Sequence, residues 1–177
     1  MPDPRGRRAS AFASVASVTE AARLAVFVVG NASRGDDALG PALLASIESL
    51  LPAAARVTVD FQLQIEHALA LVEADLVLFI DAELRLKQDY SFREIHAGRR
   101  RGVFSHALSP AQVLEVFEEI CATPAPPAFV LGIAAHQFGL GSTLSGEARR
   151  SLAAARAFAG RLLGMPAVGA WRDIAGR

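Results

Sequence analysis

The segment from Val28 to Gly40 places two adjacent carboxylates directly after a buried strand, and this feature constrains the fold most strongly. The apolar run 24–29 ends at Gly30-Asn31, and Asp36 and Asp37 follow where a helix is expected to begin. Such a run is typical of a strand buried on both faces, as in a parallel sheet. Acidic residues in a first helical turn also satisfy free N–H groups and complement the helix dipole. The segment therefore predicts strand, loop and helix, with acids that either cap the helix or belong to a site.

The rest of the chain repeats this alternation of strand and helix. Further strands are expected at 57–61, 75–81, 90–96 as a weak edge strand, and 129–133. Apolar residues at helical spacing predict the buried faces of four helices: Leu39, Leu43, Ile47 and Leu50; Ile65, Ala68, Leu69 and Val72; Val113, Leu114, Phe117, Ile120 and Cys121; Leu152, Ala155, Ala159 and Leu162. This order predicts an α/β fold, a three-layer αβα sandwich with a mostly parallel twisted sheet of about five strands.

Length and charge restrict the organisation of the chain. At 177 residues it is expected to form one domain over 23–177, preceded by a loose N-terminal extension over 1–22. The 18 basic and 18 acidic residues cancel, which disfavours nucleic acid as a partner. No apolar run reaches the roughly 20 residues of a membrane helix. With a single cysteine the chain forms no internal disulfide. We expect the protein to be cytoplasmic and monomeric.

The expected topology brings the acidic residues to one edge of the sheet. Asp36 and Asp37 follow the first strand, and Asp81 ends the third. The carboxyl ends of parallel strands meet at the same edge, where ligands bind in open α/β sheets. Two carboxylates and an imidazole there would form a divalent metal site with open coordination positions. The alternative is that Asp81 is satisfied by helix N-termini and loop amides alone.

Four histidines compete for the third ligand position. His106 leads because it lies at a loop-to-helix junction before Ser109-Pro110 and can project over the sheet edge. His67 is expected on the polar side of a helix, His96 in the weak edge strand and His136 in a glycine-flanked loop. A solvated loop histidine is the simpler explanation for His106, so position alone leaves the ligand open.

Four sequence blocks together resemble the hydrogenase maturation endopeptidases. They occur in that family's order and cover residues 24 to 163: Gly30-Asn31 with Gly35-Asp36-Asp37-Ala38-Leu39-Gly40, Val77-Leu78-Phe79-Ile80-Asp81-Ala82, Ser105-His106-Ala107-Leu108-Ser109-Pro110, and Val130-Leu131-Gly132-Ile133. The resemblance implies that Asp37, Asp81 and His106 hold a metal. One departure is the segment from Asp60 to His67, where many family members carry a glycine pair after the acidic residue.

The resemblance also implies an activity and a partner. Members of the family remove a short C-terminal extension from the large-subunit precursor of a nickel-iron hydrogenase after nickel insertion. The nickel is carried by the precursor, and another divalent metal such as zinc or cadmium can occupy the site in vitro. The metal would polarise the scissile carbonyl or a water, with Asp36 or Asp37 as general base. Asn31, Gln62 and Gln64 would bind the substrate, although the two glutamines could instead cap the next helix.

Three other functions compete with this interpretation. A non-catalytic chaperone that checks nickel loading would use the same ligands. A peptidyl-tRNA hydrolase has a similar strand and Gly-Asn start, but it needs a catalytic histidine after that loop and a basic RNA-binding face. A nucleotide-binding module is disfavoured because the first loop has neither a G-x-G-x-x-G run nor a P-loop lysine.

Overall fold

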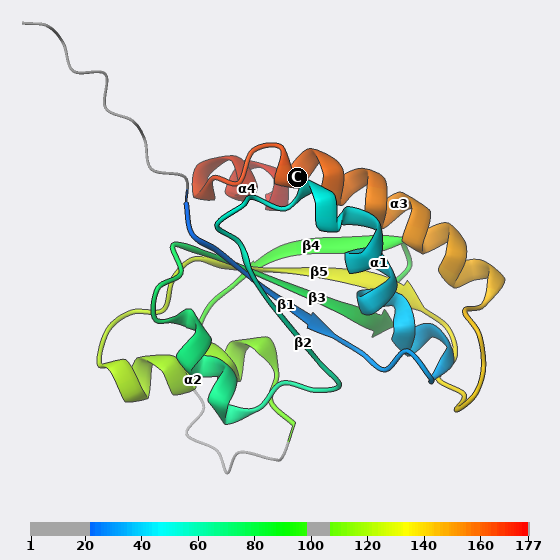
Figure 1. Ribbon diagram of the computed structural model, residues 1–177, viewed down its shortest axis with the longest axis horizontal. Coiled ribbons are helices and arrows are strands. Elements are labelled where there is room, and N and C mark those ends of the chain that lie inside the picture. The colour runs from blue at the N-terminus through cyan, green and yellow to red at the C-terminus, as the bar shows by residue number, and fades with distance from the viewer. Residues whose placement is uncertain (1–21, 99–106, 177) are drawn as a thin grey trace, which may run out of the picture.

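The computed structural model describes residues 22–98 and 107–176, which form a five-stranded sheet between two layers of helices (Figure 1). The strand order is β2-β1-β3-β5-β4, and only β4 is antiparallel to its neighbour. The strands are β1 (Leu24–Val29), β2 (Arg56–Asp60), β3 (Leu76–Leu84), β4 (Tyr90–Ile95) and β5 (Ala128–Ala135). The α/β class and the mostly parallel sheet are thus confirmed. The predicted N-terminal extension lies outside the described residues, except for residue 22. Residues 99–106 also lie outside them.

Helices cover both faces of the sheet (Figure 1). The α-helices are α1 (Leu39–Ile47), α2 (Pro110–Cys121), α3 (Gly146–Leu163) and α4 (Val168–Ala175), and the 3-10 helices are η1 (Gly35–Ala38), η2 (Glu48–Leu50) and η3 (Ile65–Leu71). One core layer lies under α1, α3 and α4, and the other under α2 and η3. Successive strand residues point to opposite faces, so each central strand supplies both layers. No helix in the described part of the chain is long and apolar enough to span a membrane.

The segment after β2 corrects a predicted helical face. Residues 65–71 form the 3-10 helix η3, in which Ala68 and Leu71 are buried. Ile65, Leu69 and Val72 are instead exposed, so the expected face is wrong. The period accounts for most of this, because a 3-10 helix has three residues per turn: Ala68 and Leu71 share one face and Leu69 and Val72 another, while Ile65 is exposed as the first residue of the helix. Apolar side chains therefore remain on the surface beside β2.

Other predicted boundaries and faces also change. β3 does not end at Asp81, since residues 82–84 continue to pair with β5 as far as Ala135. α1 ends at Ile47, which leaves Leu50 exposed, and Ile120 near the end of α2 is exposed as well. The predicted N-cap Ser109 is confirmed: its Oγ accepts from the backbone N–H of Gln112, and Pro110 begins the helix.

Helix α4 is absent from the sequence prediction. It is only eight residues long and brings Trp171 into the core with no exposed surface. The indole N–H donates to the carbonyl oxygens of Leu162 and Met165 at 3.1 and 3.0 Å. Short helices are marginal by themselves, so α4 depends on this tertiary anchor rather than on its local pattern.

Candidate functional site

The turn after β1 is built around Gly30. Its φ of +140° is one that L side chains rarely adopt, and a Cβ there would lie 2.1 Å from the carbonyl oxygen of Asp37. The Gly30 N–H donates to the carbonyl oxygen of Asp60 at 3.0 Å. Glycine thus allows η1 to pack directly against the end of β1, and this close approach sets the position of the two acids.

We expect Gly30→Ala to lower the free energy of unfolding by roughly 2–4 kcal/mol, because the new methyl group must displace the Asp37 backbone. Thermal unfolding followed by circular dichroism measures this loss. Gly169→Ala in α4 is the matched control, since a Cβ there meets no atom within 4 Å. Equal losses for the two variants would contradict the tight packing inferred at Gly30.

Asp36 is fully buried and acts as a tie between distant loops. Its Oδ2 accepts from the backbone N–H groups of His136 and Gln137 and from the Ser145 hydroxyl, at 2.9, 3.1 and 2.9 Å. Its Oδ1 accepts from the Ser145 N–H at 2.7 Å. Burial raises the pKa of this carboxyl, but the hydrogen bonds from these three residues hold it below its usual value. The charge is therefore stabilised by the loop between β5 and α3.

Asp37 points in a different direction from Asp36 and is only half-buried. Its Oδ2 accepts from the Asn31 N–H at 3.2 Å, and its own N–H donates to the carbonyl oxygen of Arg34. The Asn31 side chain accepts from the Ser33 N–H at 2.9 Å, which fixes the loop. Asp37 thus keeps lone pairs for a ligand, whereas Asp36 has committed its own to backbone donors.

Asp81 lies on the sheet face that α2 and η3 cover, in register with Gly132 of β5. Burial raises the pKa of the Asp81 carboxyl to about 7, against a hydrogen bond from the Ala82 N–H that lowers it. The negative charges of Asp37 and Glu83 raise it further. The charge of Asp37 therefore acts on Asp81, and their role as joint ligands stays a prediction.

A polar cluster beside Asp81 was not expected from the sequence. Glu83 accepts from the Ser91 hydroxyl and from the Arg93 guanidinium, at 3.2 and 2.9 Å. The cluster lies over Gly132, where a Cβ would be 2.2 Å from Oε2 of Glu83. Arg93 also lowers the pKa of Asp81. The sequence does contain one indication of this cluster, because residues 81 and 83 are two apart in a strand and therefore lie on the same face.

The histidines take places that differ in part from the prediction. His67 is buried, not on a polar helix side: Nδ1 accepts from the Gln64 N–H at 2.9 Å, and Nε2 lies 3.5 Å from Oδ2 of Asp60. His136 follows β5 and His96 follows β4. His106, the predicted ligand, lies outside the described residues, as do Arg99 to Arg101. Among the described residues no group of three or more His, Cys, Asp or Glu is placed to hold a metal ion.

The two glutamines precede η3. Gln64 is its N-cap residue: its main-chain carbonyl oxygen accepts from the His67 N–H at 3.1 Å, and its own N–H donates to Nδ1 of His67 at 2.9 Å. Gln62 is exposed between β2 and η3. The capping role that the sequence left open thus applies to Gln64, and substrate binding by either residue stays a prediction.

Comparison with known proteins relates this geometry to solved structures. No protein-family model matches the sequence, and no curated protein is significantly similar to it. The NiFe hydrogenase maturation protease HycI from Thermococcus kodakarensis aligns with a TM-score of 0.61 and 19% identity, over 81% of this chain and 94% of that chain. The hydrogenase maturating endopeptidase HybD from E. coli gives 0.60 and 17%, over 79% and 91%. This chain has the hydrogenase maturation protease fold.

A third solved structure agrees. The hydrogenase 2 maturation peptidase from a Thaumarchaeota archaeon gives a TM-score of 0.57 with 20% identity, over 80% of this chain and 98% of that chain. The chain therefore spans nearly the whole length of these structures, and the family resemblance seen in the four sequence blocks is confirmed at the level of the fold. Fold alone does not fix chemistry, so activity rests on the site residues.

Proposed function

We propose that this chain is an endopeptidase that removes the C-terminal extension of a nickel-iron hydrogenase large-subunit precursor after nickel insertion. Asp37, Asp81 and His106 would recognise the nickel that the precursor carries. The observation that carries the proposal is the placement of Asp37, directly after β1, and Asp81, on the neighbouring parallel strand β3, toward the carboxyl edge of a sheet with the maturation protease fold. All three proposed ligands belong to a single chain. We also infer that the protein acts in the cytoplasm.

The electrostatics of Asp81 support a cation at this place. A half-buried carboxyl whose pKa is raised by the charges of two further carboxylates is unfavourable when ionised, and a divalent cation reverses that balance. Carboxylate and imidazole donors suit nickel, which stands high in the divalent affinity order. Zinc or cadmium fits the same donors and serves as a probe. The donor set thus fits a metal that arrives with the substrate.

The two neighbouring acids receive separate roles in the proposal. Asp36 positions the turn, because its oxygens already accept four hydrogen bonds. Asp37 is the ligand and the carboxylate able to accept a proton from an attacking water, since within the described residues its side chain accepts a hydrogen bond only from the Asn31 N–H. The metal on the substrate would polarise the scissile carbonyl. Asn31 and the segment with Gln62 and Gln64 border the same edge and would contact the extended tail.

The proposal is tested on purified precursor. Wild-type protein incubated with the nickel-loaded large subunit should shorten it by a fixed C-terminal mass, measured by intact mass spectrometry. Asp81→Asn and His106→Ala should each reduce the rate by about 100-fold or more, because each removes a ligand of the bound metal. Asp75→Asn, at the opposite end of β3, is the matched control and should cleave at the wild-type rate.

The same experiment separates cleavage from a checking role. A non-catalytic chaperone would bind the nickel-loaded precursor and leave its mass unchanged. Nickel-free precursor should stay uncut in every sample. Normal processing by Asp81→Asn or His106→Ala would contradict the ligand assignment. A precursor that stays intact with wild-type protein would contradict the proposed protease activity.

A further inference from the structure

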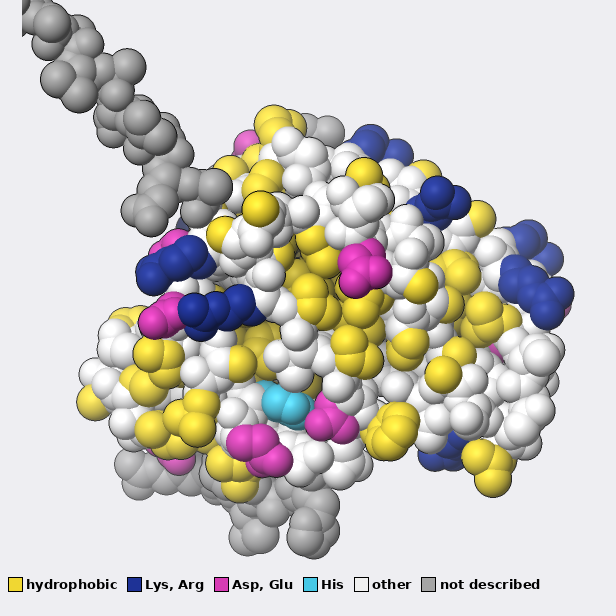
Figure 2. Space-filling model, in the orientation of Figure 1, with side chains coloured by type: hydrophobic (Ala, Val, Ile, Leu, Met, Phe, Trp, Pro, Cys, Tyr) yellow, Lys and Arg dark blue, Asp and Glu magenta, His cyan; other side chains and the backbone are white. Residues whose placement is uncertain are grey.

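Strand β2 is an edge strand with an apolar surface. Within the described residues it pairs with β1 alone, and in the view of Figure 1 it passes in front of the other strands. Val57 and Val59 keep 41% and 53% of their surface exposed. Seven of the eleven exposed large hydrophobic residues in the described part lie between Leu50 and Val72. Figure 2 shows hydrophobic side chains gathered at the centre of this face.

In residues 22–98 and 107–176, the opposite edge of the sheet is protected by a helix and an ion pair to that helix, whereas β2 has no such cover. β4 packs against α4, and its Glu94 accepts from the Arg172 guanidinium at 2.8 and 2.9 Å. Unprotected strand edges invite pairing with another chain, so natural proteins cover or charge them. β2 carries charge only at its ends, Arg56 and Asp60, and its centre is Val-Thr-Val.

Among the described residues, the backbone groups of β2 that have no strand partner are those of the two valines. The carbonyl oxygen of Asp60 accepts from the Gly30 N–H and so points toward β1. Backbone groups alternate in direction along a strand, so those of Thr58 and Arg56 point the same way and those of Val57 and Val59 point outward. The register with β1 places both valine side chains on the α1 face, opposite Val26 and Val28.

In place of the monomer expected from the sequence, we propose that a second copy of this chain pairs with β2 in antiparallel orientation, about a twofold axis at Thr58, and joins the two sheets. In this register Val57 and Val59 of the partner subunit form a hydrogen-bonded pair through their outward groups, and the symmetric pair does the same. The Thr58 residues of the two copies face each other as a non-hydrogen-bonded pair. This inference is independent of the proposed peptidase activity.

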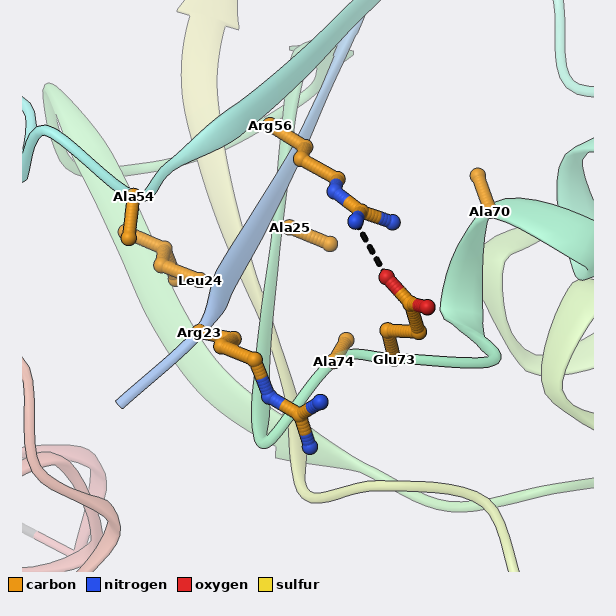
Figure 3. A pocket seen from close by; sticks show the side chains of 8 residues that line it. All are labelled: Arg23, Leu24, Ala25, Ala54, Arg56, Ala70, Glu73 and Ala74. Carbon is orange, nitrogen blue, oxygen red and sulfur yellow. Dashed lines mark hydrogen bonds and ion pairs between the residues drawn. The ribbon is translucent and has the colours of Figure 1, made fainter. Parts of the chain in front are cut away.

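Charge complementarity selects this register and this occupant. Arg56 lies across from Asp60 of the partner subunit at both ends of the pairing, because the two residues are equally distant from Thr58. Figure 3 shows Arg56 reaching from β2 to Glu73, with which it forms an ion pair. In the dimer its guanidinium would lie between two carboxylates. Sliding the strands by two residues removes both cross-strand ion pairs, so the sequence of β2 is complementary to itself.

The oligomeric state of the full chain tests the proposal. Sedimentation equilibrium at micromolar concentration should give twice the mass of one chain. Val59→Lys should raise the dissociation constant by about tenfold or more, since it places a charge in the centre of the new pairing. Ile120→Lys, the same change at a residue 55% exposed on α2, is the control and should stay dimeric.

A charge-reversal cycle and a cross-link test the register. Arg56→Glu and Asp60→Arg should each weaken the dimer, and the double variant should recover at least half of the lost affinity. Thr58→Cys in a Cys121→Ser background should form an intermolecular disulfide on mild oxidation, because residues of a non-hydrogen-bonded pair lie close. A wild-type monomer would overturn the proposal and leave an extended peptide as the remaining occupant. A dimer insensitive to Val59→Lys would overturn it too.

Discussion

Asp36→Ala is expected to lower the free energy of unfolding by roughly 3–5 kcal/mol, the largest loss from one side chain at this site. The substitution leaves three backbone N–H groups and the Ser145 hydroxyl without their acceptor in a fully buried place. Chemical denaturation of the metal-free protein measures the change. The turn between β1 and α1 and the loop before α3 should then separate, which hydrogen exchange at residues 136 and 137 would report.

The pH dependence gives this prediction a second readout. The folded pKa of Asp36 lies below its ordinary value of 3.8, so the stability that the ionised carboxylate contributes is present above that pH and is lost as the pH falls through the folded pKa. Asp36→Asn keeps the size of the side chain and removes this titration. Its stability relative to wild type should therefore be lowest at neutral pH and recover in acid. If the difference in free energy of unfolding between Asp36→Asn and wild type stayed constant from about pH 3 to about pH 7, the lowered pKa of Asp36 would be wrong.

The regular part of the fold was predictable because hydrophobic burial decides it. β1 matches the apolar run Leu24–Val29 residue for residue, and the capped start of α2 at Ser109 follows from its local chemistry. Prediction failed where tertiary contacts decide. η3 adopts a tighter period than its apolar spacing indicates, and α4 exists through the burial of Trp171. The position of the strand ends likewise depends on the neighbouring strand.

The site was predictable only as far as topology fixes it. Parallel strands bring Asp37 and Asp81 to one edge whatever their side-chain details, so their proximity follows from strand order alone. The separate fate of Asp36 depends on Ser145, which is 109 residues away in sequence. No local pattern shows such a contact. Arg93 likewise reaches Glu83 only because β4 and β3 flank the same glycine of β5.

Asp81→Asn should have the opposite effect to the loss of Asp36 and stabilise the metal-free fold. The pKa of Asp81 is raised from its ordinary value of 3.8 to about 7, so wild type loses stability as the pH rises between these values. The amide of asparagine does not ionise, so the variant does not lose this stability. We expect no difference near pH 4 and, above pH 7, a gain on the order of 2–4 kcal/mol in the presence of a chelator.

The gain at Asp81 should reverse when a divalent metal is added. Zinc or nickel in excess should raise the melting temperature of wild type and leave that of Asp81→Asn nearly unchanged, because ligand binding to the folded state alone adds stability. Asp75→Asn separates this effect from the simple removal of an acid, since Asp75 pairs with Arg23 at the other end of β3 and its loss should not stabilise the fold. If Asp81→Asn were less stable than wild type at pH 8 without metal, the strained carboxyl inferred here would be wrong. A stabilised and inactive variant would mean that the fold keeps a costly charge at this edge because the reaction needs it.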